Sequence, residues 1–358
     1  NFKGTPQRSP SAIARAIEGR GGHLNAFTGR ESTCFYARVI DEQIHIAVDI
    51  LSDITQHSLF PEEEIERERN VILEELKNIE DTPDEWVFEN FFHQIFADHP
   101  LGRSIIGTRE SLGMINREQL VLYRDRYYVS PYLVVAAAGR VNHNRLVRLV
   151  SRKFDHRPLM PLQRVPFSMG GNKQVHQLKV KANTQQTHIV WGVHAYPYND
   201  PRKYALLVLN AVLGGGMSSR LFQTLRERHG LAYSVYSFTE FFSDTGLFGI
   251  YVGTEPQKVK KALQLIHKEL DRLTKNSLSH RQLEFYKDQL KGSLLLGLES
   301  PSARMNRLGK MEIYTGRWYS LDEVVAQLDK VTVDDVKSVA EDLFSQRPQF
   351  TTMLTSDV

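Results

Sequence analysis

The stretch DHRPLMPLQRVPFSMGG, residues 155–171, divides the chain of 358 residues into two parts. It contains three prolines and two glycines and has neither the period of a helix nor that of a strand. Such a composition is typical of a linker, and the chain is long enough for two ordinary domains. We therefore predict a first domain over residues 1–157, a linker over 158–171 and a second domain over 172–358.

Similar orders of helices and strands are predicted on both sides of this linker. Before it, Ser9 and Pro10 favour the start of a short helix, and alternating, aromatic and β-branched residues predict either two strands or one long bent strand within 23–39. The further helical patterns before the linker cover 44–56 and 61–79. After the linker, a strand region at 231–253 accompanies helical patterns at 218–230, 260–273 and 283–298. The prediction is an α+β fold of two homologous domains, each with a mostly antiparallel sheet packed against helices.

The two copies differ in their acidic residues. Aligning IERERNVILEELK with LEFYKDQLKGSLL pairs Glu68 with Tyr286, and the same alignment pairs Glu75 with Ser293. Glu68 and Glu75 are two helical turns apart and lie on nearly one stripe of their helix. They are either part of a solvated charged face, which the spacing alone favours, or a metal ligand with a supporting acid. No two histidines in the sequence are spaced i, i+4 as in a metal-binding helix.

Composition excludes several classes of protein. Lys and Arg number 45 and Asp and Glu 42, and the basic residues are scattered, so the charge pattern of a nucleic-acid-binding protein is missing. Cys34 is the only cysteine, which excludes an internal disulfide framework and a cysteine-ligated metal site. The longest apolar run, at 132–139, has only the length of a strand, so we expect no membrane span.

Two other segments could bind a peptide. GGHLNAFTGRE (21–31) is either an ordinary hairpin or an edge strand open to an extended peptide. GGGMSSRLFQTLRERHGLAYSVYS (214–237) lacks the Gly-Lys-Ser/Thr ending of a P-loop, which excludes that kind of phosphate site. Within it, Arg226 and Tyr233 either donate hydrogen bonds to a peptide carbonyl or an oxyanion, or Arg226 only forms an ion pair.

Together these segments resemble the pitrilysin/insulinase family of zinc peptidases, the inverzincins with an H-x-x-E-H motif. The resemblance is greatest to the small branch that includes the mitochondrial processing peptidase and its bacterial relatives. It covers essentially the whole chain. The matching segments are FKGT (2–5), GGHLNAFTGRESTCFYARV (21–39), ERNVILEELKNIEDTPDE (68–85), HPLGRSIIGT (99–108), YLVVAAAGRV (132–141) and LGGGMSSRLFQTLRERHGLAYSVYS (213–237).

The family pattern runs from H-x-x-E-H-x-x directly into F-K-G-T. We therefore expect the two histidine ligands and the general-base Glu just upstream of Asn1, outside this sequence. The resemblance implies that Glu75 is the third zinc ligand and that Glu68 is a supporting acid that tunes the site. Arg226 and Tyr233 would contact the substrate or the tetrahedral intermediate. The implied edge strand for the substrate consists of Asn25, Ala26, Phe27 and Thr28.

The activity that the resemblance implies is zinc-dependent hydrolysis of peptides or unfolded polypeptide segments. Family members of this size pair into a chamber, so we expect a homodimer that encloses its substrate. The alternative is a catalytically inactive structural or partner subunit of the same fold, and a plain peptide-binding scaffold is a third class. The residues leave the compartment open; the cytoplasm is favoured, and the periplasm and the mitochondrial matrix are compatible with them.

Overall fold

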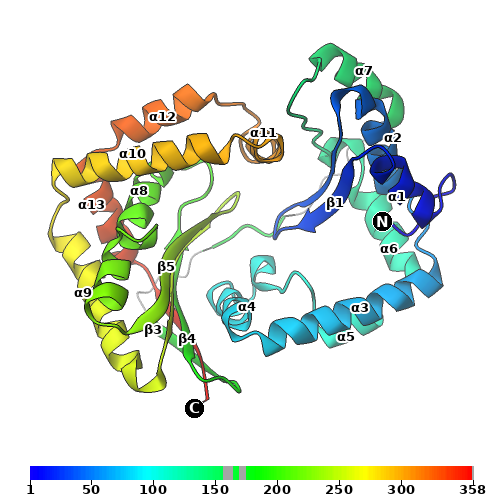
Figure 1. Cartoon of the computed structure of the whole chain (residues 1–358). Coiled ribbons are helices and arrows are strands. Elements are labelled where there is room, and N and C mark those ends of the chain that lie inside the picture. The colour runs from blue at the N-terminus through cyan, green and yellow to red at the C-terminus, as the bar shows by residue number, and fades with distance from the viewer. Residues whose placement is uncertain (156–163, 169–174, 357–358) are drawn as a thin grey trace. The chain divides into compact units, whose positions relative to one another are not determined.

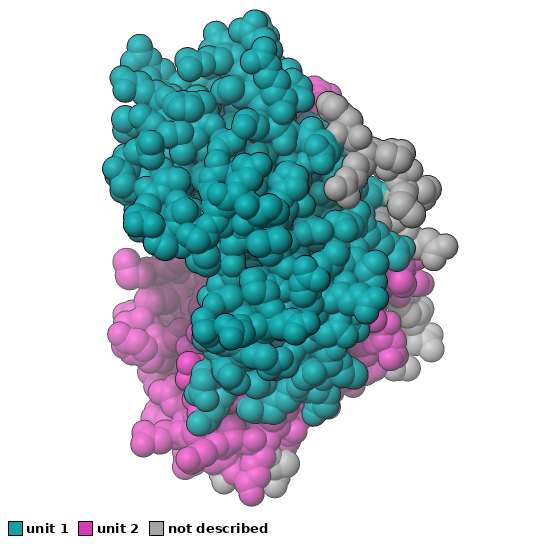
Figure 2. Space-filling model, turned by 90° about the vertical axis from the view of Figure 1, so that its right-hand side faces the viewer, with its two compact units in different colours: residues 1–77, 105–164, 298–316 teal, residues 78–104, 165–297, 317–358 magenta. Residues whose placement is uncertain are grey.

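The computed structural model describes residues 1–155, 164–168 and 175–356. Most of the predicted linker, 158–171, lies outside these described residues. The chain forms two compact units, which have different colours in Figure 2. Unit 1 comprises residues 1–77, 105–164 and 298–316, and unit 2 comprises 78–104, 165–297 and 317–358. The predicted division into two homologous domains refers to sequence repeats rather than to these units, and it stays a prediction.

Unit 1 is mainly helical and contains one two-stranded antiparallel sheet. The strands are β1 (His23–Thr28) and β2 (Thr33–Arg38). The helices are α1 (Pro10–Glu18), α2 (Ile44–Gln56), most of α3 (Glu62–Asp81), α5 (Arg109–Met114), α6 (Arg117–Tyr127), α7 (His143–Lys153) and α11 (Pro301–Thr315). The Ser9 side chain accepts a hydrogen bond from the Ala12 amide and caps α1, as the sequence predicts.

The core of unit 1 lies between α1, α2 and one face of the β1–β2 sheet. Ile17 of α1 and Ile54 of α2 are fully buried in it, and Leu24 and Phe35 from the two strands pack against them. Burying a side chain of this size stabilises the fold by about 1.5 to 3 kcal/mol. This core fixes the inner face of the β1–β2 sheet, and the side chains of the opposite face remain available for binding.

The FKGT segment is tied to α2 through a buried carboxylate. The Asp53 side chain accepts a hydrogen bond of 2.8 Å from the Thr5 hydroxyl and forms an ion pair with Arg8. Arg8 also pairs with Asp49, which Lys153 of α7 contacts as well. Burial alone would raise the pKa of Asp49, but the hydrogen bond from Lys153 and the charge of Arg8 hold it below its ordinary value. The network fixes residues 1–8 against α2.

Unit 2 is built on a five-stranded sheet with the order β3-β7-β4-β6-β5. Its strands are β3 (Val175–Lys181), β4 (Thr187–Ala195), β5 (Ala232–Phe241), β6 (Gly246–Thr254) and β7 (Gln349–Thr355). Its helices are α4 (Pro83–Ile95), α8 (Lys203–Gly214), α9 (Val259–Lys275), α10 (His280–Gly297), α12 (Leu321–Lys330) and α13 (Val333–Glu341). Only the β3–β7 pair is parallel among these strands. The predicted α+β class with mostly antiparallel strands is confirmed.

Helices cover both faces of this sheet. In Figure 1, α8, α9, α10 and α13 lie on one side of it and α4 on the other. The first core includes Trp191 of β4 and Leu209 of α8, and the second joins Phe91 of α4 to Val190 of β4. Alternate residues of one strand thus enter two different cores, as expected for a sheet buried on both faces.

Three local features differ from a simple reading of the sequence pattern. The apolar run 132–139 forms no strand, because no other described strand pairs with it. The predicted helix at 218–230 is largely a π-helix, Phe222–Arg228. The glycine run that precedes it has a packing role: a Cβ on Gly214 would lie 2.1 Å from the Ser237 amide nitrogen, so only glycine lets α8 approach β5 here.

None of the described helices is both long and apolar enough to cross a membrane.

Candidate active site

Helix α3 presents Glu68 and Glu75 on its exposed side. Three glutamates in its first turn suit the helix dipole, and Leu76 is its only buried residue. Both candidate acids are exposed, and their seven-residue interval places them about 10 Å apart along one stripe of the helix. The structure therefore brings the two predicted acids onto one face of one helix, open to a ligand.

Glu68 lies beside the first residues of the chain. Its carboxylate is 3.1 Å from Lys3 Nζ, and Glu64 is 3.6 Å from the same nitrogen. The hydrogen bond and the charge of Glu68 raise the pKa of Lys3. The Ser58 hydroxyl donates a hydrogen bond of 2.7 Å to the Asn1 carbonyl, which holds the start of the chain in place. The first residues of the FKGT segment therefore lie next to the acidic stripe of α3.

The Glu75 side chain has no hydrogen bond or ion pair within the described part of the chain. Near the start of the same helix, the carboxylates are paired: Arg67 contacts Glu64, and Arg69 lies 2.7 Å from Glu66. The side chain of the neighbouring Glu74 also has no hydrogen bond or ion pair within these described residues, but it points about 100° away around the helix. Glu75 is thus a free carboxylate on the Glu68 stripe, which suits a metal ligand.

Residues 1–155, 164–168 and 175–356 contain no group of three or more His, Cys, Asp and Glu side chains arranged to hold a metal ion. A zinc site needs at least three protein ligands. The described residues therefore do not complete a zinc site by themselves.

The predicted substrate strand is β1. It pairs antiparallel with β2, and within the described residues its second edge has no strand partner. Such an edge can hydrogen-bond to an extended peptide. Ala26 is half-buried, whereas Asn25, Phe27 and Thr28 are exposed. The strand that the sequence suggested for peptide binding is thus an edge strand in the structure.

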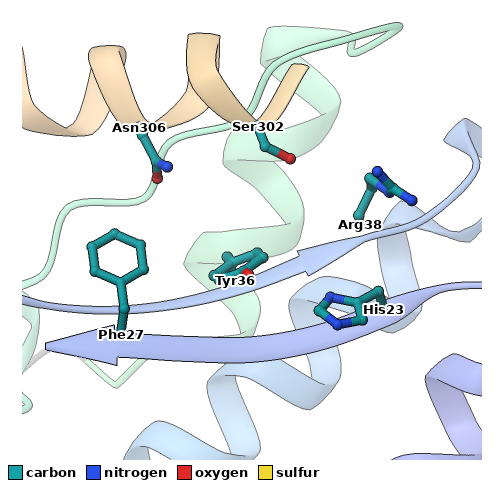
Figure 3. A pocket seen from close by; sticks show the side chains of 6 residues that line it. All are labelled: His23, Phe27, Tyr36, Arg38, Ser302 and Asn306. Carbon is teal, nitrogen blue, oxygen red and sulfur yellow. The ribbon is translucent and has the colours of Figure 1, made fainter. Parts of the chain in front are cut away.

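A cavity of about 430 Å³ opens on the outer face of this sheet (Figure 3). Phe27 and Tyr36 line it with rings whose centroids are 6.2 Å apart. The other lining residues are His23, Arg38, Ser302 and Asn306. The first two are cross-strand partners on β1 and β2, and the last two come from α11. Sequence reasoning did not find this cavity, because α11 follows β2 by more than two hundred residues.

In unit 2, the structure places Arg226 against Tyr233. The guanidinium donates a hydrogen bond of 3.1 Å to the Tyr233 carbonyl and lies 4.7 Å from the centre of its ring. The pairing of β5 with β6 passes from Ala232 directly to Ser234, so Tyr233 lies at a β-bulge. Its side chain is 78% exposed. Bulges and π-helices often occur at binding sites, where they redirect side chains. Both possibilities for Arg226 stay open, because it also lies 3.8 Å from Glu227.

Comparison with known proteins identifies the family to which this chain belongs. The model of the insulinase family, peptidase family M16, matches residues 1–109, and the model of the peptidase M16 inactive domain matches residues 114–290. The chain belongs to peptidase family M16. An uncharacterized zinc protease of Streptomyces coelicolor is 40% identical over 353 residues, which are 97% of this chain and 77% of that protein. The uncharacterized zinc protease YmxG of Bacillus subtilis is 37% identical, over 96% of this chain and 84% of that protein.

Solved structures support the M16 fold. A crystal structure of a protease from Helicobacter pylori has a TM-score of 0.89 and covers 99% of this chain and 87% of that one, at 19% identity. A peptidase M16 inactive domain from Pseudomonas fluorescens has a TM-score of 0.85, covers 100% of this chain and 86% of that one, and is also 19% identical. The family resemblance read from the sequence motifs is confirmed.

Proposed function

We propose that the full-length protein is a zinc-dependent endopeptidase that cleaves peptides or unfolded polypeptide segments. The observation that carries this proposal is the exposed, unpaired carboxylate of Glu75, on the same stripe as Glu68, in a chain of family M16. Zinc proteases are also among the named relatives. Bound zinc would polarise the scissile carbonyl and lower the pKa of a water molecule.

Each candidate residue has a role in this proposal. Glu75 would be one zinc ligand, alongside the histidines that the family pattern places before Asn1. Glu68, through its ion pair with Lys3, would orient that upstream segment. The exposed edge of β1, at residues 25–28, would align the substrate as an added strand. Arg226 and Tyr233, held together in unit 2, would donate hydrogen bonds to the substrate.

The proposal includes a homodimer that forms a chamber around the substrate. This part rests on the resemblance to small family members that pair in this way. Size-exclusion chromatography with light scattering would measure the mass in solution, and a monomeric mass at working concentrations would contradict the dimer.

The decisive experiment measures zinc content and cleavage of a quenched peptide by the full-length encoded protein. We expect about one zinc per chain and cleavage that a chelator abolishes. Glu75→Gln should lose both, because an amide cannot replace the charged ligand. Glu74→Gln is the matched control: it removes an equally exposed neighbouring carboxylate from a different face, so zinc and activity should persist.

Other results would change the conclusion. If the parent protein neither binds zinc nor cleaves, the protein is an inactive structural or partner subunit of the same fold. If Glu75→Gln retains full zinc content and activity, the assignment of Glu75 is wrong even though the protein is a peptidase.

A further inference from the structure

We propose that the cavity beside β1 is a specificity subsite for an acidic side chain of the bound peptide. The inference rests on the proposed binding of peptides along the β1 edge. It goes beyond that function because it names the kind of substrate residue that the protein selects and the side chains that select it.

The position of the cavity follows from strand geometry. His23 pairs with Arg38, Asn25 with Tyr36 and Phe27 with Cys34, so these six side chains share the outer face of the sheet. A peptide added along the free edge of β1 would lie about 4.8 Å from it and would direct every second side chain to that same face. Those side chains would lie beside the cavity, whose floor is formed by β1 and β2 (Figure 3).

The inner face of the sheet keeps this lining in position. Leu24 and Phe35 project to the opposite side and pack against the core of α1 and α2. On the outer face, the ring of Tyr36 lies 6.1 Å from that of His23 and 6.2 Å from that of Phe27. The aromatic side chains thus form a continuous wall. The cavity is therefore part of a fixed surface rather than a gap between loops.

The polar groups of the lining favour an anion. Arg38 is cationic, His23 has a ring N–H, and Ser302 and Asn306 can each donate a hydrogen bond. No acidic residue lines the cavity. Within residues 1–155, 164–168 and 175–356, the side chain of Arg38 forms no hydrogen bond or ion pair, unlike that of Arg140, which lies 3.4 Å from Asp41. An unpaired guanidinium among several donors is the arrangement that binds a carboxylate.

The volume of the cavity and its aromatic wall indicate which anionic ligand fits: the acidic side chain of a peptide. A volume of about 430 Å³ falls in the usual range for a small-ligand pocket. Phe27 and Tyr36 would cover the methylene groups, and the donors would meet the carboxylate. Glu or Asp of an extended peptide combines both features. The six lining residues therefore indicate a preference for an acidic residue at one register of the peptide.

The test compares two peptides with blocked ends, identical except for Glu or Gln at one scanned position. Blocking the ends ensures that the carboxylate comes only from a side chain. Binding to the full-length protein is measured by fluorescence anisotropy with chelator present, and cleavage is measured separately without it. At one position we expect about 10-fold tighter binding of the Glu peptide, appearing in KM rather than kcat.

Variants of the cavity then identify the residue responsible. Arg38→Gln should reduce the ratio of the affinities for the Glu and Gln peptides to about one. Arg38→Glu should instead favour a Lys peptide at that position, a gain that misfolding cannot produce. Arg140→Gln is the matched control, because it removes an exposed, paired arginine outside the cavity, and it should keep the preference.

The results separate this inference from the proposed function. Acid-selective binding without any cleavage would support the subsite and contradict the peptidase. Cleavage with no acidic preference at any position, or a preference that survives Arg38→Gln, would overturn the subsite alone. A protein that binds none of the peptides would overturn both.

Discussion

Helices α3 and α10 are aligned in the predicted sequence repeat, but their side chains have different surroundings in the structure. In α3, only Leu76 is buried, and Glu68 and Glu75 are exposed. In α10, Tyr286, the counterpart of Glu68, is buried in the core of unit 2. The helix face that carries Glu68 is exposed and polar in α3, whereas the aligned face of α10 packs into the core of unit 2. The two helices are aligned in sequence, but they differ in what their side chains contact.

The comparison predicts that truncating two aligned residues changes the free energy of unfolding by very different amounts. The larger of these changes is the largest effect that we expect. Tyr286 is 8% exposed, and its hydroxyl donates a hydrogen bond of 3.3 Å to the Ser218 carbonyl. Tyr286→Ala should lower the free energy of unfolding of unit 2 by about 3 to 5 kcal/mol, because it leaves a cavity. Denaturant unfolding measures this loss.

The matched variant in unit 1 is Glu68→Ala. Its side chain is 48% exposed and makes one surface ion pair, so we expect a change within about 0.5 kcal/mol. A cost similar to that of Tyr286→Ala would show that α3 also serves as a packing helix, and the contrast between the two copies would fail.

Acidification should reduce the stability of unit 2 at a higher pH than it reduces that of unit 1. Burial, aided by the charge of Arg347, lowers the pKa of His194 in unit 2 from 6.5 to about 4. Between these values the unfolded chain binds a proton that the folded chain does not, so stability falls as the pH drops from 6.5 to 4, by at most about 3 kcal/mol. The lowered pKa of Asp49 in unit 1 also makes stability fall on acidification, but in a lower pH range, because its stabilisation is lost only as the pH falls below 3.8.

Hydrogen exchange with mass spectrometry at pH 7 and pH 5, corrected for the intrinsic pH dependence of exchange, would measure this difference. We expect unit 2 to lose more protection than unit 1. His194→Gln should reduce the difference, and His188 and His267, whose pKa values burial also lowers, should account for the remainder. Equal loss of protection in both units would contradict the assignment.

The smallest effect concerns the bulge in unit 2. Tyr233→Phe removes one exposed hydroxyl, so we expect kcat/KM for peptide cleavage to fall about 10-fold and stability to stay unchanged. Tyr236→Phe is the control, because Tyr236 lies in register on the same strand and stacks on Tyr251. If both variants behave alike, the bulge gives Tyr233 no special role.

Local signals in the sequence were sufficient for most elements. Ser9 and Pro10 predicted the start of α1, and the alternation within 23–39 predicted the strand region, which the structure divides into β1 and β2. The run at 132–139 forms no strand, because a strand depends on a partner that its own pattern does not specify. The π-helix at Phe222–Arg228 and the bulge at Tyr233 also depend on tertiary packing, and the pattern contained no sign of them.

The candidate site was predictable to the extent that it is local. The seven-residue interval placed Glu68 and Glu75 on one face of a helix, but only the structure showed that Glu75 has no partner among the described residues. Alternation along the strands could have placed His23 and Arg38 on one face. The contribution of α11 to the cavity could not be read from the sequence, because it results from the fold of unit 1.

The open edge of β1 has a consequence for the behaviour of the protein at high concentration. Main-chain hydrogen bonds do not distinguish a substrate from another copy of the same strand, so an edge that accepts peptides can also start self-association. Arg38 lies on the neighbouring strand, and its counterpart on a second copy would repel it. The charge that would attract acidic peptides would thus also act as a gatekeeper against aggregation.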